Sequence, residues 1–239
     1  MFPIGDDNHG ARGIPLVTVS LVVVNVLVFM YQSVLPLDEL QAFIFKYGVI
    51  PAEIEAGHDL YTLFTSMFVH GGFAHIFGNM LFLWIFGDNI EQRFGSLLYL
   101  LFYLACGLAA SLAHIYTNQG SLVPSVGASG AISGVMGAYV LLYPFNRVRV
   151  LVWYWGIVYV PAYMFLGIWF LTQLFNGLIE LQVATAQTSG VAFWAHVGGF
   201  VGGLVGGAVL GVLRREPPRD PFETGIWVQR GSRRDFPFG

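Results

Sequence analysis

Four polar side chains in otherwise apolar segments are of types and at spacings that suit nucleophilic chemistry. Ser129 lies in Gly127-Ala128-Ser129-Gly130, where residues without bulk leave its Oγ accessible to a second helix and to a peptide backbone. His196 lies in a later apolar segment, and His75 and Asn79 are four residues apart, so they share one face of a helix. A serine that meets a histidine base is the arrangement that nucleophilic catalysis requires.

The same residues also have a purely structural interpretation. Small residues from Gly127 to Gly137 form a face that suits close packing of membrane helices. A single intramembrane histidine such as His196 is as often a hydrogen-bonding partner between helices as a catalyst. The choice between the two interpretations therefore depends on whether the polar residues converge in space.

The composition indicates a polytopic all-α membrane protein. Of 239 residues, 56% are hydrophobic and only 10% are charged, which is far more apolar than a soluble domain of this length. The one cysteine, Cys106, excludes an intramolecular disulfide framework and a thiolate metal cluster. We find no internal repeat, which weakens the case for a transporter built from duplicated halves.

Six apolar segments are each about long enough to cross a bilayer as a helix. They lie near residues 14–35, 69–87, 96–116, 126–143, 161–180 and 191–213. Residues 1–13 lack the features of a signal peptide, so we expect the first span to stay in the mature protein. We therefore divide the chain into an N-terminal segment (1–13), a six-helix membrane domain (14–213) and an arginine-rich tail (214–239).

The distribution of cationic residues predicts the orientation. Ten arginines lie before the first span, after the sixth, or in the loops that share that side, whereas the opposite loops hold only Lys46. Because cytoplasmic loops are enriched in Lys and Arg, both termini are expected in the cytoplasm.

With this topology, the four polar residues fall at similar depth in the outer half of the bilayer. Ser129 and His196 each lie a few residues inside the outward end of a span. Gly199, Gly203, Gly207 and Gly211 repeat every four residues after His196, and such a ridge permits close approach of another helix. We expect this ridge to meet Ser129, Ser133 and Gly137 of the fourth span, which would bring the serine and the histidine together.

Several other segments carry weaker signals. The long connection at residues 36–68 is expected to lie partly in the outer membrane interface. Val150 to Val160, rich in Trp and Tyr, either lies in the opposite interface or extends the fifth span. Gln173, Asn176 and Glu180 are interpreted as structural or interfacial residues rather than as chemical groups.

These motifs resemble the rhomboid family of intramembrane serine proteases, particularly its prokaryotic six-span members. The matching stretches occur in the same order and cover about 200 residues. They are His70-Gly71-Gly72-Phe73-Ala74-His75-Ile76-Phe77-Gly78-Asn79, Glu91-Gln92-Arg93-Phe94-Gly95, Gly127-Ala128-Ser129-Gly130, Trp169-Phe170-Leu171-Thr172-Gln173 and Ala195-His196-Val197-Gly198-Gly199. The resemblance implies a six-transmembrane-helix rhomboid-like bundle.

The resemblance also implies roles for individual residues. Ser129 would attack the substrate with His196 as its base, and His75, Asn79 and the backbone N–H of Ser129 would hold the oxyanion. Residues 181–190 would cap the site, and the fifth span would gate it. The implied partners are single-span transmembrane substrates and membrane lipid, with no nucleic acid and no cofactor or metal. A prokaryotic plasma membrane is the expected location.

The sequence departs from the family pattern at one position, and it leaves two alternative functions open. Some family members place an aromatic ring four residues after the nucleophile, beside the catalytic histidine, but this chain has Ser133 there. The main rival is a rhomboid-like protein that binds transmembrane segments without cutting them, although it has no need to retain both Ser129 and His196. The second is a small-solute transporter, which does not explain why the polar layer lies in one half of the bilayer.

Overall fold

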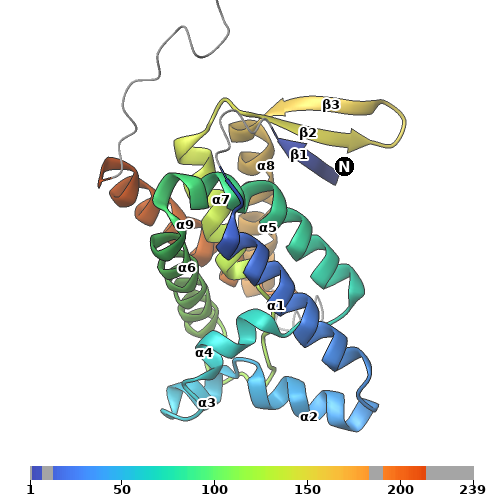
Figure 1. Ribbon diagram of the computed structural model, residues 1–239. Coiled ribbons are helices and arrows are strands. Elements are labelled where there is room, and N and C mark those ends of the chain that lie inside the picture. Colours follow the sequence, from blue (N-terminus) through green and yellow to red (C-terminus); the bar gives the residue numbers. More distant parts are fainter. Residues whose placement is uncertain (1, 7–12, 183–190, 214–239) are drawn as a thin grey trace, which may run out of the picture.

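The computed structural model is mostly helical, with one small sheet at one end of the bundle (Figure 1). It describes residues 2–6, 13–182 and 191–213. The elements, in chain order, are β1 (Phe2–Asp6), α1 (Leu16–Ser33), α2 (Leu37–Tyr47), α3 (Pro51–Glu55), α4 (Thr62–Thr65), η1 (Ser66–Phe68), α5 (Phe73–Phe94), α6 (Ser96–Thr117), α7 (Ser129–Leu142), β2 (Arg147–Val152), β3 (Gly156–Pro161), α8 (Ala162–Gln182) and α9 (Phe193–Leu213). The predicted membrane-helix architecture is confirmed.

The number of straight spans differs from the six expected. Four described helices, α1, α6, α8 and α9, are long and apolar enough to cross a bilayer. The second expected span, at residues 69–87, corresponds to α5, and the α4–η1 segment before it meets α5 at 95°. The fourth, α7, is only 14 residues long. The six-span count therefore remains a prediction.

The short helix α7 lies at the centre of the bundle, with α5, α6, α8 and α9 around it. All ten residues from Gly130 to Tyr139 are buried. Phe86 of α5 packs edge-on against Tyr139, with the ring centroids 4.9 Å apart. A helix that is apolar on every side is suited to this enclosed position.

Glycines set the close approach of α7 and α9. A Cβ added to Gly199 or Gly203 would overlap the carbonyl oxygen of Gly130 or Gly134, respectively. The predicted glycine ridge of α9 therefore contacts α7. It meets Gly130 and Gly134 there, and Gly137 of α7 lies against the backbone of Phe200 in α9. The side chain of Ser133 donates a hydrogen bond to the Ser129 carbonyl within α7 (2.6 Å).

A buried carboxylate ties the start of α1 to α5 and α6. Glu91 accepts hydrogen bonds from the backbone N–H groups of Val17 and Thr18 (2.9 and 2.8 Å), and from the hydroxyls of Thr18 and Ser96 (2.8 and 2.7 Å). The first N–H groups of a helix have no partner within the helix, and the helix dipole there favours a negative charge. Glu91 thus fixes where α1 begins relative to the bundle.

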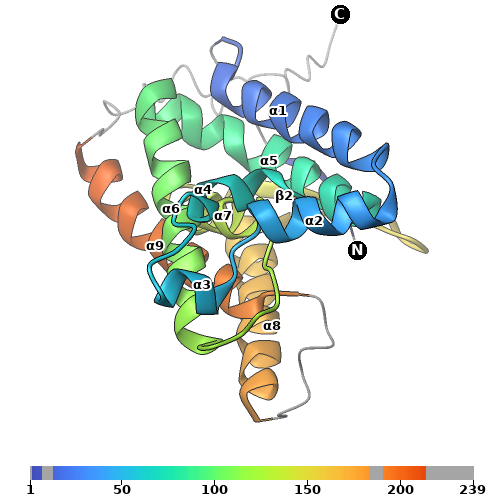
Figure 2. The same cartoon turned by 90° about the horizontal axis from the view of Figure 1, so that it is seen from below.

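The long connection at residues 36–68 folds into α2, α3, α4 and η1, which lie across one end of the longer helices (Figure 2). The amphipathic helix α2 has no buried residues. One bridge, Val49 with Ser125, joins this connection to the segment that precedes α7.

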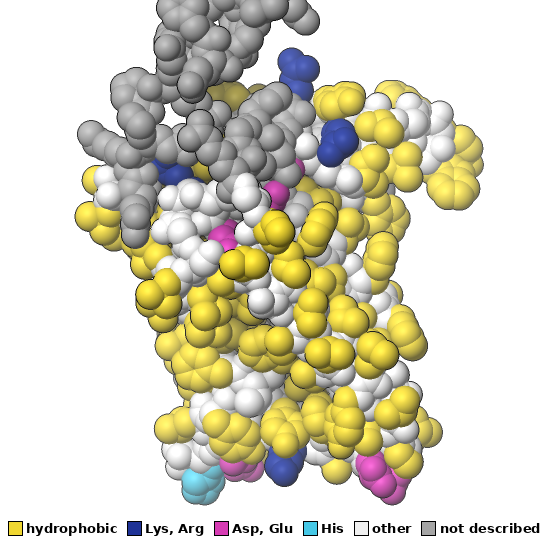
Figure 3. All heavy atoms as spheres, viewed as in Figure 1, with side chains coloured by type: hydrophobic (Ala, Val, Ile, Leu, Met, Phe, Trp, Pro, Cys, Tyr) yellow, Lys and Arg dark blue, Asp and Glu magenta, His cyan; other side chains and the backbone are white. Residues whose placement is uncertain are grey.

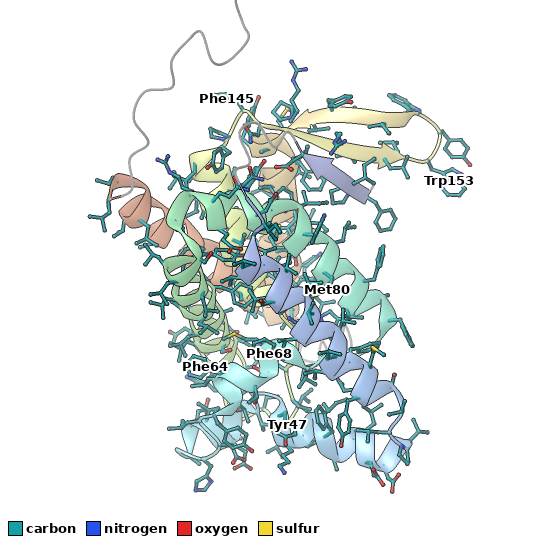
Figure 4. All side chains as sticks on the ribbon, in the orientation of Figure 1. Tyr47, Phe64, Phe68, Met80, Phe145 and Trp153 are labelled. Atoms are coloured by element: carbon teal, nitrogen blue, oxygen red, sulfur yellow. The ribbon has the colours of Figure 1, made fainter. Side chains whose placement is uncertain are left out.

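The opposite end carries a three-stranded antiparallel sheet that the sequence interpretation did not predict (Figure 1). Val150 to Val160 does not extend the fifth span, because β2 and β3 form a hairpin there. Its tip, at Trp153, points away from the bundle (Figure 4), and Trp153, Tyr154 and Trp155 are each more than 80% exposed. The interfacial alternative for this stretch remains a prediction.

The N-terminal segment also departs from expectation, because β1 pairs with β2. Asp6 accepts hydrogen bonds from the Tyr139 hydroxyl (2.5 Å) and from the Asn89 amide (2.9 Å). Burial raises the pKa of Asp6 to about 6, with a further increase from the nearby Asp88 carboxylate. The segment is therefore part of the folded bundle at residues 2–6.

Side chains of different kinds separate along the long axis of the molecule (Figure 3). In this view, charged side chains gather near the two ends, and hydrophobic side chains cover the flank between them. Leu27 of α1, Trp84 of α5 and Ile168 of α8 are large apolar residues that are 57–60% exposed. Such a belt is what a surface in contact with lipid requires.

Candidate active site

Ser129 and His196 meet through the close packing of α7 and α9. Ser129 is the first residue of α7, and His196 lies in the first turn of α9. The Oγ atom of Ser129 is 2.8 Å from the Nε2 atom of His196. This is the separation that a nucleophile and its general base need.

The second ring nitrogen of His196 is held by α8. Its Nδ1 atom is 2.8 Å from the Oε1 atom of Gln173. Because a carbonyl oxygen only accepts, Nδ1 carries the proton and the lone pair of Nε2 faces Ser129. Gln173, which the sequence interpretation left outside the chemistry, therefore orients the histidine. The sequence does indicate this role, because Gln173 follows Trp169 by four residues in one of the matching stretches.

The aromatic ring beside His196 comes from α8 rather than from α7. The ring of Trp169 lies 5.8 Å from that of His196, at 37°. Some family members carry this ring at the position of Ser133, which is a buried serine in this chain. Trp169 and Gln173, one helical turn apart, thus contact the imidazole together.

His75 and Asn79 lie near the start of α5, one helical turn apart. The Gly71 N–H is 3.4 Å from Nδ1 of His75, which makes Nδ1 the acceptor and leaves the proton on Nε2. The Nδ2 atom of Asn79 is buried and has no hydrogen-bond partner among the described residues. Two donors thus remain free to bind an acceptor in the pocket.

Gly127 permits these donors to reach the start of α7. Its φ is +127°, which residues with a side chain rarely adopt. A Cβ at this position would lie 2.7 Å from Nε2 of His75 and 3.6 Å from Nδ2 of Asn79. The backbone N–H groups in the first turn of α7 have no partner within the helix, so they add donors at the same place.

The segment before α5 is held by α1. The side chain of Gln32 donates to the His70 carbonyl and accepts from the His70 N–H, both at 3.0 Å. The ring of His70 in turn contacts that of His75, with the centroids 5.2 Å apart. This clamp fixes the start of α5 and hence the position of His75.

A pocket of about 850 Å³ joins these groups. Ser129, His196, His75 and Asn79 all line it, as does Trp169. The four side chains selected from the sequence therefore lie in one cavity. The expected cap falls mostly on residues 183–190, which lie outside the described residues, as does the tail at 214–239.

Comparison with known proteins identifies the family. A family model described as the rhomboid domain matches residues 57–213, which is more than half of the chain. The chain belongs to the rhomboid family. This membership and the long apolar helices make it an integral, multi-pass membrane protein.

Several rhomboid proteins from bacteria and plants are similar in sequence. Rhomboid protease GluP of Bacillus subtilis is 31% identical over 136 residues, which is 57% of this chain and 26% of the relative. RHOMBOID-like protein 12, mitochondrial, of Arabidopsis thaliana is 31% identical over 199 residues, 77% of this chain and 55% of the relative. Rhomboid protease AarA of Providencia stuartii is 28% identical over 155 residues, 59% of this chain and 55% of the relative. The chain thus spans from about a quarter to little more than half of these relatives.

Proposed function

We propose that this rhomboid protein is an intramembrane serine endopeptidase with a Ser129–His196 dyad. The observation that carries the proposal is the 2.8 Å contact between Ser129 Oγ and His196 Nε2. The pocket around it also holds Nδ2 of Asn79, which has no hydrogen-bond partner among the described residues. Two of the similar proteins are named rhomboid proteases, which supports the same reaction class.

In the proposed reaction, the Ser129 hydroxyl gives its proton to Nε2 of His196 as Oγ adds to the scissile carbonyl carbon. The carbonyl oxygen becomes an oxyanion, which the Nε2–H of His75, the Nδ2–H of Asn79 and the backbone N–H of Ser129 stabilise. Such donors act strongly because they are oriented before charge develops, and the loss of one costs about 10²- to 10³-fold in rate.

The intermediate then collapses as His196 returns the proton to the departing amide nitrogen, so that the C–N bond breaks and Ser129 carries the acyl group. A water molecule next gives a proton to His196 and adds to the acyl carbon. Collapse of this second intermediate releases the carboxylic acid and restores the Ser129 hydroxyl. Gln173 keeps Nδ1 protonated through both steps because its oxygen accepts that hydrogen bond.

The substrates in this proposal are single-span membrane proteins that reach the pocket from the lipid. The apolar flank of the molecule favours a substrate that is itself embedded in the bilayer. A prokaryotic plasma membrane, with both termini in the cytoplasm, belongs to the same proposal and rests on the distribution of arginines.

Cleavage of a single-span model substrate in liposomes tests the proposal. The purified unmodified chain is compared with Ser129→Ala and His196→Ala, and the folding of each is checked by thermal unfolding. We expect product from the unmodified chain and a loss of at least about 10³-fold in both variants, since nucleophile and base act as a unit. Equal cleavage by folded variants would show that the dyad is misassigned.

The rival function, binding of transmembrane segments without cleavage, predicts a different outcome. The unmodified chain would then bind several single-span peptides with the same affinity as Ser129→Ala and would release no product from any of them. A transporter would instead move solute across the liposome membrane even with Ser129→Ala.

A further inference from the structure

Two residues of α8, Trp169 and Glu180, line the pocket. Trp169 and Gln173 contact His196, and Glu180 lines the same pocket seven residues after Gln173. Seven residues make almost two full turns, so Glu180 lies on the same face as Gln173 and about 10 Å further along the helix. Between them, the carbonyl of Gly177 accepts a hydrogen bond from Trp194 of α9 (3.1 Å), which fixes this face of α8 against α9.

Glu180 is distinctive among the groups that line the pocket. Of the described pocket residues, it alone is an Asp, Glu, Lys or Arg. Within the described part of the chain, its carboxylate forms neither a hydrogen bond nor an ion pair. The fold has thus placed one unpaired carboxylate in a cavity that holds no cationic side chain from the described residues.

This position is costly for a carboxylate. Glu180 lies in the last turn of α8, which ends at Gln182. Carbonyl groups at the end of a helix carry a partial negative charge, so they disfavour a carboxylate and favour a cation. A negative side chain with no structural partner at the negative end of a helix is therefore suited to bind a positively charged group.

We propose that Glu180 and the C-terminal end of α8 form a subsite for a basic side chain of the substrate. The inference rests on the proposed protease function. An extended peptide advances about 3.3 Å per residue, so side chains a few residues from the scissile bond can reach other parts of the same pocket. The subsite would thus take a Lys or Arg a few residues from the scissile bond, on the side that faces the end of α8.

A substrate series tests this subsite. A single-span substrate whose cut site has been mapped receives Lys, Gln or Glu at two, three or four residues on either side of the cut. With the unmodified chain in liposomes, we expect kcat/KM to be about three- to tenfold higher for Lys than for Glu at the matching position, since a partly exposed ion pair contributes modestly.

Charge variants of Glu180 make the test specific. With Glu180→Gln, the difference between the Lys and Glu substrates should disappear, and with Glu180→Lys the preference should reverse. A merely structural role for Glu180 predicts equal effects on all three substrates. The control is Glu39→Gln on the exposed helix α2, which removes one negative charge far from the pocket and should keep the Lys preference.

A binding measurement distinguishes a failure of this inference from a failure of the proposed function. The affinities of the Lys, Gln and Glu peptides for the Ser129→Ala chain are measured by fluorescence polarisation. A Lys preference that Glu180→Lys reverses supports the subsite even when the unmodified chain cleaves nothing, an outcome that overturns the protease function alone. Equal rates and equal affinities across the series, or a Lys preference that survives Glu180→Lys, would overturn the subsite.

Discussion

At the residue scale, the candidate site combines a serine and a histidine with a neutral amide in place of a carboxylate. Gln173 fixes the tautomer of His196 just as a carboxylate would, but it brings no negative charge to the imidazolium of the proposed reaction. The aromatic face of Trp169 adds a second constraint on the same ring. Orientation, rather than charge, is the contribution of α8 to the dyad.

Sequence reasoning found four of the polar residues that line the pocket, but not the group that positions His196. Ser129, His196, His75 and Asn79 were identifiable because polar groups at membrane depth are costly and these four fall at one depth. Gln173 lies in an apolar helix that also carries Asn176 and Glu180. The rotation of α8 about its axis separates Gln173 from Asn176, and the position along the helix separates Gln173 from Glu180. The hydropathy pattern does not determine that rotation.

The role of Gln173 predicts the effect of its removal. Gln173→Leu deletes the acceptor of the Nδ1 hydrogen bond, so the imidazole samples the other tautomer and other orientations. We expect kcat to fall by about 10- to 100-fold, which is part of the roughly 10²- to 10⁴-fold that general base catalysis contributes, while KM and the thermal unfolding midpoint change little. Steady-state kinetics in liposomes measures both constants.

Asn176→Leu is the matched control, because Asn176 is an amide on the same helix that lines a separate groove away from His196. It should keep nearly full activity. Unchanged kcat in Gln173→Leu would contradict the positioning role.

At the element scale, the site depends on how closely α7 and α9 approach. The glycine spacing in α9 predicted a close contact, and the structure confirms it. On α7, the expected contact of Gly137 is confirmed, whereas Gly130 and Gly134, which meet Gly199 and Gly203, were not among the expected partners. The hydroxyl of Ser133 bonds to the backbone of its own helix, as serines in membrane helices commonly do.

A methyl group at this contact should separate the two helices. Gly203→Ala places its Cβ against the Gly134 carbonyl, which is backbone and has no rotamer to change. We expect a loss of about 1–3 kcal/mol in stability, as for other overpacked sites, together with a large loss of activity as Ser129 moves from His196. Thermal unfolding in detergent and the cleavage assay measure the two effects.

Gly167→Ala is the matched control, since a Cβ there meets open space on α8. It should leave both quantities nearly unchanged. Equal behaviour of the two variants would show that the glycine contact does not position the dyad.

The small sheet was not predicted, although the sequence of β2 itself has a strand pattern. β2 alternates arginine and valine at residues 147–150, and the valines are buried, which is a strand pattern. The surrounding Trp and Tyr residues instead suggested an interfacial or membrane segment. β1 has no comparable pattern in five residues, and its partner lies more than 140 residues away in the chain. Such a pairing depends on the tertiary fold.

The buried carboxyl of Asp6 predicts that the attachment of β1 depends on pH. Its pKa of about 6 exceeds the ordinary 3.8, so the folded state binds the proton more tightly than the unfolded state. The stabilisation is on the order of 3 kcal/mol, is fully present below about pH 4, and is lost as the pH rises through about 6. Asp6→Asn should remove this dependence.

Hydrogen–deuterium exchange of residues 2–6, corrected for intrinsic exchange rates, measures the opening of β1 at pH 4, 6 and 8. In the unmodified chain, protection should fall across this series, and in Asp6→Asn it should stay constant. Asp38→Asn, on the exposed helix α2, should behave like the unmodified chain. The same protection at every pH in the unmodified chain would refute the prediction.

At the scale of the whole molecule, composition and apolar segments were enough to predict a helical membrane bundle. They did not predict the bend before α5 or the short length of α7, because a window of about 20 apolar residues is interpreted as one straight helix. Gly71 and Gly72 instead precede a sharp turn into α5, and α7 begins only at Ser129. These two departures place the donors and the nucleophile inside the bundle rather than at its surface.

The central claim is that Ser129 is an activated nucleophile. Its most direct test treats the purified full chain in liposomes with a serine-reactive fluorophosphonate and locates the adduct by mass spectrometry. We predict one adduct, on Ser129, which His196→Ala abolishes while the variant remains folded, and no adduct on the neighbouring Ser125 or Ser133. A folded chain that gives no adduct on Ser129, or one that labels Ser129 equally well without His196, would contradict the account.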